Sequence, residues 1–153
     1  MTKLRNSSSP SSLRQDFISG DWVVVATGRA ARPDDFKKKP KKKLKQTLPC
    51  RFCQITKYEK PIVAYRDGEP ISNPPYEGWT TVVVANRYPA FLPGLKLRKR
   101  RTGLYRVMNS KGFHELVITA DHYQDIGQME IKKVKELIDV YQNRCLALYG
   151  EPD

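Results

Sequence analysis

Acidic residues are scarce in this chain of 153 residues, which holds 16 Asp and Glu against 28 Lys and Arg. The formal net charge of +12 argues against a basic partner and indicates an anionic one. Nucleic acid, nucleotides, sugar phosphates and an acidic membrane surface all meet that description, and charge alone does not choose among them. The length predicts one domain with one core, and a hydrophobic fraction of 39% is typical of a globular protein.

Long hydrophobic runs are also missing. Residues 1–12 are polar and serine-rich, so they predict a flexible tail and no signal peptide. The longest aliphatic runs, at 23–26 and 82–85, are far too short to cross a bilayer. With three cysteines, an odd number, the sequence predicts a soluble cytoplasmic protein with reduced thiols and no membrane partner.

The chain has only three cysteines and two histidines, but two of the cysteines have a spacing that is typical of metal ligands. The stretch LPCRFCQ at 48–54 places Cys50 and Cys53 at the Cys-x-x-Cys spacing of half a zinc site. No second Cys-x-x-Cys and no His-x-His comes later in the chain, so His114 and His122 are the candidates for a third ligand. A strand rises about 3.3 Å per residue, so His114 and His122 would lie too far apart along it for both to bind one ion. A redox pair or two buried thiols are the alternatives for the cysteines.

Hydrophobic patterning predicts several strands followed by one long helix. Apolar residues at three- and four-residue steps predict a helix over 128–149, with Gly150 as its C-cap. The fold class is therefore α+β, an antiparallel sheet of about five strands with one long C-terminal helix, which leaves one sheet face poorly covered. The predicted strands are 22–27, 61–65, 79–85, 104–108 and 113–119.

Polar groups at two strand ends are candidates for binding an anionic ligand. Arg29 and Arg32 follow the first strand, and a guanidinium can grip phosphate with two parallel hydrogen bonds. Asn86 follows the strand at 79–85 and offers both a donor and an acceptor to a base or ribose. Ordinary surface arginines and a turn-forming asparagine are the alternatives. The lysine-rich run at 37–45 predicts a solvated loop, because its like charges repel one another.

Four segments in this order resemble the galactose-1-phosphate uridylyltransferase family of the histidine triad superfamily. They are LRQDFISGDWVVVATGRAARPDDF, CRFC, GWTTVVVANRYPAF, and GFHELVITADH followed by an amphipathic helix. The resemblance covers nearly all of residues 13–149. It implies a truncated N-terminal domain of this family over 13–153, with the fold of an incomplete histidine-triad-like half-barrel.

The resemblance implies a structural zinc site. The family's Cys-x-x-Cys corresponds to Cys50 and Cys53, and the histidine of its Pro-Asp-His corresponds to His122, so these three would bind Zn²⁺. The family thereby favours His122 over His114. Ala120 stands where the family has proline, a departure that does not touch the ligand.

The resemblance also implies a nucleotide site. Arg29 and Arg32 match the family's Arg-Ala-x-Arg-Pro, near the nucleotide phosphates and ribose, and Asn86 matches a nucleotide-contacting asparagine. Some members carry an acidic residue after that asparagine, where this chain has Arg87. The preference for uridine or adenosine is therefore open.

The activity implied is transfer of a nucleotidyl group between sugar phosphates in galactose metabolism. Family members hold a His-Pro-His after the helix, whose first histidine is the fourth zinc ligand and whose last is the nucleophile. These 153 residues hold no such motif, so no catalytic residue is assigned and the chain alone is not expected to turn over. The chain is thus predicted to be the N-terminal part of a UDP-glucose:hexose-1-phosphate uridylyltransferase, with a nucleotide sugar and a hexose 1-phosphate as partners.

Two other functions are compatible with the same residues. An adenylyltransferase like ADP-glucose phosphorylase is the main alternative within the family. A non-catalytic basic module that binds nucleotide or nucleic acid through 37–45 and 96–101 is the other, although nucleic acid is not expected as the partner of a family member. The predicted protein partners are a separate C-terminal half, which would supply the motif that this sequence does not hold, or a homodimer partner.

Overall fold

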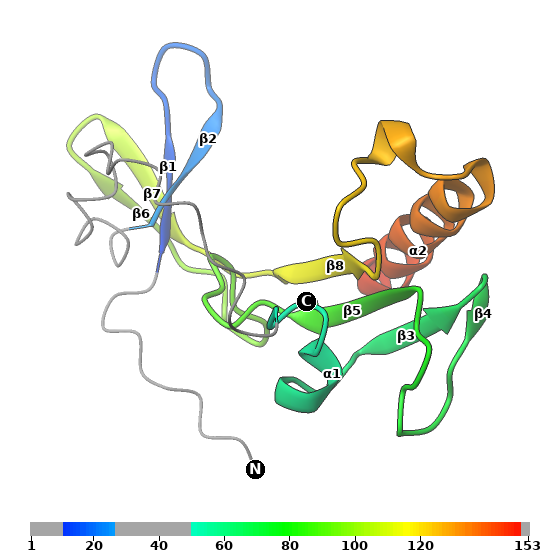
Figure 1. Ribbon diagram of the computed structural model, residues 1–153. Coiled ribbons are helices and arrows are strands. Elements are labelled where there is room, and N and C mark those ends of the chain that lie inside the picture. The colour runs from blue at the N-terminus through cyan, green and yellow to red at the C-terminus, as the bar shows by residue number, and fades with distance from the viewer. Residues whose placement is uncertain (1–10, 27–49, 151–153) are drawn as a thin grey trace, which may run out of the picture. The chain divides into compact units, whose positions relative to one another are not determined.

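The computed structural model describes residues 11–26 and 50–150 (Figure 1). The chain divides into two compact units, and each is considered by itself. Unit 1 comprises Met1–Lys45 and Tyr88–His114, and unit 2 comprises Gln46–Arg87 and Glu115–Asp153. Arg29, Arg32 and the lysine-rich run at 37–45 lie outside the described residues.

Unit 1 contains a four-stranded antiparallel sheet in the order β2-β1-β7-β6. The turn between β1 and β2 is closed by Asp16, whose Oδ1 accepts hydrogen bonds from the backbone N–H groups of Ile18 at 2.8 Å and Ser19 at 3.1 Å. These bonds lower the pKa of the Asp16 carboxyl, the bond from Ser19 most of all. The strands are β1 (Ser12–Gln15), β2 (Trp22–Val25), β6 (Lys99–Thr102) and β7 (Tyr105–Asn109).

Unit 2 contains a second four-stranded antiparallel sheet, in the order β4-β3-β5-β8. The turn between β3 and β4 has Asp67 at φ 50° and Gly68 at φ 91°, the left-handed pair that a tight hairpin requires. The elements are α1 (Ile55–Tyr58), β3 (Val63–Arg66), β4 (Glu69–Pro70), β5 (Thr81–Ala85), β8 (Glu115–Thr119), a 3-10 helix η3 (Ile126–Gln128) and α2 (Ile131–Tyr149).

The core of unit 2 is built on both faces of β5. Val82, Val83 and Val84 are all buried, although successive strand residues point to opposite faces. Val82 and Val84 pack with Ile55 of α1, so α1 lies against that face. The other face, of Thr81 and Val83, meets α2 (Figure 1). The expectation that one sheet face would be poorly covered is therefore wrong for this sheet.

Two polar contacts fasten α2 to the sheet of unit 2. The Glu136 carboxylate is buried and accepts hydrogen bonds from the hydroxyls of Thr80 at 2.7 Å and Thr81 at 2.5 Å, and from the Gly68 backbone N–H at 2.5 Å. Arg144 forms a two-pronged ion pair with Glu115 on β8, at 2.7 and 2.8 Å. These contacts fix both the register and the rotation of α2 over the sheet.

The structure confirms the α+β class and the long C-terminal helix. Each predicted strand has a counterpart, within two or three residues at its ends. The strands are divided between two sheets instead of one, and three of them, β1, β4 and β6, were not predicted, nor was α1. Among the described residues, no helix has the length and apolarity needed to cross a membrane.

Candidate metal centre

The side chains of Cys50, Cys53 and His122 come together in unit 2. One potential ligand atom from each lies within 4.8 Å of the other two, and Cys53 Sγ lies 3.1 Å from His122 Nδ1. The cysteines precede α1 and the histidine follows β8, 69 positions beyond Cys53. The structure thus joins the local Cys-x-x-Cys to a distant histidine, as the resemblance implied.

The cysteine turn is held in place by the helix α1 that begins just after it. The backbone N–H of Ile55 donates to the carbonyl of Phe52 at 3.2 Å, which closes the turn. The Ile55 side chain is buried in the core of unit 2 with Val82 and Val84. Because Ile55 anchors the start of α1 in the core, the two thiols just before it project from a fixed loop while remaining at the surface.

His122 is positioned by the end of β8 and by α2. The β5–β8 pairing extends to Ala120, whose N–H donates to the carbonyl of Thr80 at 2.8 Å. Asp121 then forms an ion pair with Lys133 in the first turn of α2 at 2.9 Å. That hydrogen bond with Asp121 is the main cause of a raised pKa at Lys133. This contact has no local sequence signal, since the two residues lie 12 positions apart in different elements.

The two thiols differ in their electrostatic surroundings. The backbone N–H groups of Cys53 and Phe52 point at Cys50 and lower the pKa of its thiol. Partial desolvation, followed by the adjacent Cys50, raises the pKa of the Cys53 thiol. Two thiols with pKa values driven apart are typical of a pair that shares a charge, and a metal cation would stabilise both as thiolates.

The donor set fits zinc. Zn²⁺ takes thiolate sulfur at about 2.3 Å and imidazole nitrogen at about 2.0 Å in a tetrahedron, so its donor atoms lie roughly 3.5 to 4 Å apart. The separations of up to 4.8 Å among the three groups lie close to that requirement. Among residues 11–26 and 50–150, no fourth Cys, His, Asp or Glu joins the cluster. The three residues present could therefore hold a metal ion with one position left for another donor.

The other histidine and the third cysteine have different surroundings. His114 Nδ1 accepts a hydrogen bond from the backbone N–H of Ala90 at 2.9 Å, which suits a structural role. Cys145 is exposed on α2 and is absent from the cluster. Of the two histidines, His122 lies with the cysteines and His114 does not, which agrees with the expectation that at most one could join them.

One of the predicted nucleotide-binding residues is described. Asn86 follows β5 directly and is half-buried. Its predicted contact with a nucleotide stays a prediction, as does that of Arg29 and Arg32, which lie outside the described part of the chain.

Removing the Lys133 side chain should loosen the histidine side of the cluster. In Lys133→Ala, Asp121 loses its partner, and we expect the affinity for Zn²⁺ to fall about tenfold, the lower end for residues that orient a ligand. Competition with a chromogenic chelator measures it. Lys132→Ala is the matched control, because that lysine is exposed and its ammonium lies 4.0 Å from Glu130. Equal affinities in the two variants would show that the ion pair does not position His122.

Comparison with known proteins gives an informative similarity. The chain is 29% identical over 138 residues to a protein of Arabidopsis thaliana named ADP-glucose phosphorylase, covering 86% of this chain and 37% of that protein. No protein-family model and no solved structure matches the chain. The chain spans little more than a third of the length of the curated relative. By sequence, then, this chain is similar to part of an ADP-glucose phosphorylase, and it brings together two cysteines and a histidine that could hold a metal ion.

Proposed function

We propose that the chain is the zinc-binding and nucleotide-binding part of a nucleotidyltransferase related to the galactose-1-phosphate uridylyltransferases, and that its nucleotide sugar is ADP-glucose. The observation that carries this proposal is the similarity to ADP-glucose phosphorylase over most of the chain. The cluster of Cys50, Cys53 and His122 supports it independently, because these are the positions that the family resemblance assigns to zinc.

The similarity favours adenosine over uridine. The sequence alone placed UDP-glucose and galactose metabolism first and ADP-glucose second, and the curated relative supports the second choice. Arg87, where some uridylyltransferases have an acidic residue, is consistent with a different base. Preference for ADP-glucose is therefore the sharper hypothesis to test.

Each group in the chain has a distinct task in this proposal. A Zn²⁺ ion held by Cys50, Cys53 and His122 would supply structural support and no chemistry of its own. Asn86 would hydrogen-bond the nucleoside, with Arg29 and Arg32 on its phosphates. Phosphoryl-type transfer depends mainly on such positioning and charge stabilisation. The property expected of these 153 residues is therefore binding of the nucleotide sugar.

Titration calorimetry on the full chain, purified with Zn²⁺, tests the proposal. We expect ADP-glucose to bind at least about tenfold more tightly than UDP-glucose, since a site built for one base leaves polar groups unpaired with the other. A preference for UDP-glucose would support the uridylyltransferase interpretation instead. Absence of binding by both nucleotide sugars would remove the proposal.

Asn86→Ala should weaken that binding. Loss of one or two hydrogen bonds to the nucleoside costs about 1 to 2 kcal/mol, so we expect the dissociation constant for ADP-glucose to rise about tenfold. The same calorimetric titration measures it. Asn143→Ala serves as the control, because Asn143 is exposed on α2 and tolerates alanine. If both variants bind as the wild type does, Asn86 is a turn residue and not a nucleotide contact.

A further inference from the structure

The sheet of unit 1 carries a strongly basic surface that the metal centre does not use. The described residues of unit 1, 11–26 and 88–114, contain eight Lys and Arg and two Asp and Glu. The described residues of unit 2 are nearly balanced, with nine basic and ten acidic side chains. The positive charge of the described residues is therefore concentrated in unit 1, where it favours an anionic partner.

Two arginines on this sheet lie directly opposite each other. Arg101 on β6 pairs with Arg106 on β7, and Gln15 on β1 pairs with Arg106 from the other side, so the three side chains share one face. The described part of the chain supplies neither arginine with an ion-pair partner. Like charges directly opposite on a sheet are destabilising, and an anion between them would remove that cost.

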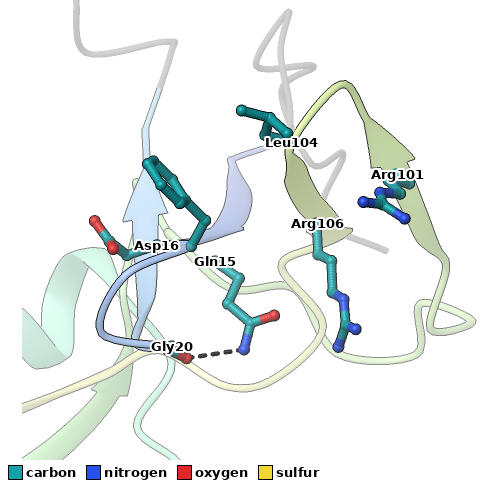
Figure 2. Close-up of a pocket in the computed structure, with 7 residues that line it drawn as sticks. Gln15, Asp16, Gly20, Arg101, Leu104 and Arg106 are labelled. Carbon is teal, nitrogen blue, oxygen red and sulfur yellow. Dashed lines mark hydrogen bonds between the residues drawn. The ribbon is translucent and has the colours of Figure 1, made fainter.

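A cavity of about 350 Å³ opens beside this pair (Figure 2). Gln15 Nε2 donates to the carbonyl of Gly20 at 2.9 Å, which fixes the amide and leaves its oxygen as an acceptor. Phe17 and Leu104 line the cavity and expose 61% and 70% of their surfaces. The one carboxylate, of Asp16, is committed to the β1–β2 turn through its bonds from Ile18 and Ser19.

We propose that this surface binds single-stranded nucleic acid. The arginine pair takes a backbone phosphate, and an unstacked base packs against Phe17 and Leu104 with the Gln15 amide oxygen as its hydrogen-bond acceptor. Basic grooves with exposed aromatic side chains are the usual means of binding single strands without strong sequence preference. This inference goes beyond the proposed function and does not depend on it, because none of its residues belongs to the metal cluster or is assigned to the nucleotide sugar.

The distribution of charge favours a strand over a mononucleotide. Lys99 lies two residues from Arg101 on the same face of β6, so the positive charge continues along the sheet beyond the cavity. A mononucleotide would neutralise only the arginine pair, whereas successive phosphates of a strand can follow the row. A duplex fits less well, since its bases are stacked and cannot reach Phe17.

Fluorescence anisotropy of the full chain with a labelled oligothymidylate of about 12 nucleotides, within the site sizes usual for single-strand binders, tests this inference. We expect the double variant Arg101→Ala/Arg106→Ala to bind about tenfold or more weakly at about 0.1 M salt, with the slope of log affinity against log salt reduced by about 1.4. The matched control is Lys132→Ala/Lys135→Ala, which removes two exposed positive charges from α2 and should leave both quantities unchanged. Circular dichroism is used to check that both double variants are folded.

A second variant separates base packing from charge. Phe17→Ala should weaken binding about fivefold or more while leaving the salt slope unchanged, since base stacking does not release counterions. If the arginine and lysine double variants lose equal affinity for oligothymidylate, the binding depends only on the net positive charge of the chain, and the inference is wrong. Equally tight binding of thymidine monophosphate or of a duplex would also overturn it. Capture by phosphatidylserine vesicles that depends on the arginine pair, without oligothymidylate binding, would overturn it too and reassign the surface to membranes.

Discussion

Cys53→Ser is expected to lower the affinity of the chain for Zn²⁺ by more than about 100-fold. Cys53 supplies one of three potential ligand atoms in the cluster and its Sγ lies 3.1 Å from His122 Nδ1. Serine keeps the size of the side chain, but its hydroxyl stays protonated at neutral pH and does not replace a thiolate. Losing a first ligand should cost more than the roughly 10- to 100-fold that residues supporting a ligand usually contribute.

Competition with a chelator and thermal unfolding with and without Zn²⁺ give two independent readings. An ion that binds only the folded chain raises its unfolding temperature, so removal of Zn²⁺ should lower that temperature in the wild type and hardly at all in Cys53→Ser. Cys145→Ser is the matched control, because it removes an exposed thiol that lies outside the cluster. If the two serine variants lose equal affinity, the cluster is not the metal site.

The cysteine half of this site was readable from the sequence because it is local. Four residues fix the spacing of Cys50 and Cys53, whatever the rest of the chain does. The histidine was not, since composition left His114 and His122 open and only the family resemblance chose between them. The contact of Asp121 with Lys133 had no sequence signal at all, because a loop and a helix bring them together.

The same distinction explains which elements were predicted. β5 and α2 have strong periodic patterns, and both were found near their true ends. The strand β1, with sequence SLRQ, and β6, with KRRT, have few of the residues that favour strands. They are strands because β7 lies between them and pairs with both. Division of the strands into two sheets likewise depends on pairing between distant segments, which no local pattern records.

Glu136→Ala is expected to lower the free energy of unfolding by about 3 kcal/mol, because it removes three hydrogen bonds to one buried, charged side chain. Glu136 is 7% exposed, and its carboxylate accepts hydrogen bonds from three donors, the hydroxyls of Thr80 and Thr81 and the N–H of Gly68. Alanine removes every acceptor at once. The buried hydroxyl of Thr81 then loses its partner, at a cost of about 1 to 3 kcal/mol, and the hydrogen bonds from the half-buried Thr80 and the exposed Gly68 are lost as well. Water entering the space left by the side chain should recover part of that cost.

Urea unfolding followed by circular dichroism measures the change. Glu130→Ala is the control, since its side chain is 67% exposed beside the start of α2. Its removal should alter stability by less than about 0.5 kcal/mol. Glu136→Gln should fall between the two, because an amide keeps one acceptor oxygen but turns its N–H donors toward the threonines. A stability for Glu136→Ala within error of Glu130→Ala would mean that packing alone holds α2 on the sheet.

Glu136 and the metal centre should also be coupled. Lys133 and Glu136 are three residues apart on α2, so they lie on the same side of the helix. Glu136 fixes that side against β5, and Lys133 then reaches Asp121 beside His122. Loosening α2 at Glu136 should therefore weaken Zn²⁺ binding as well as the fold, by at most the roughly tenfold expected for Lys133→Ala. A larger loss in Glu136→Ala would mean that α2 supports the cysteine turn by a second route through the core.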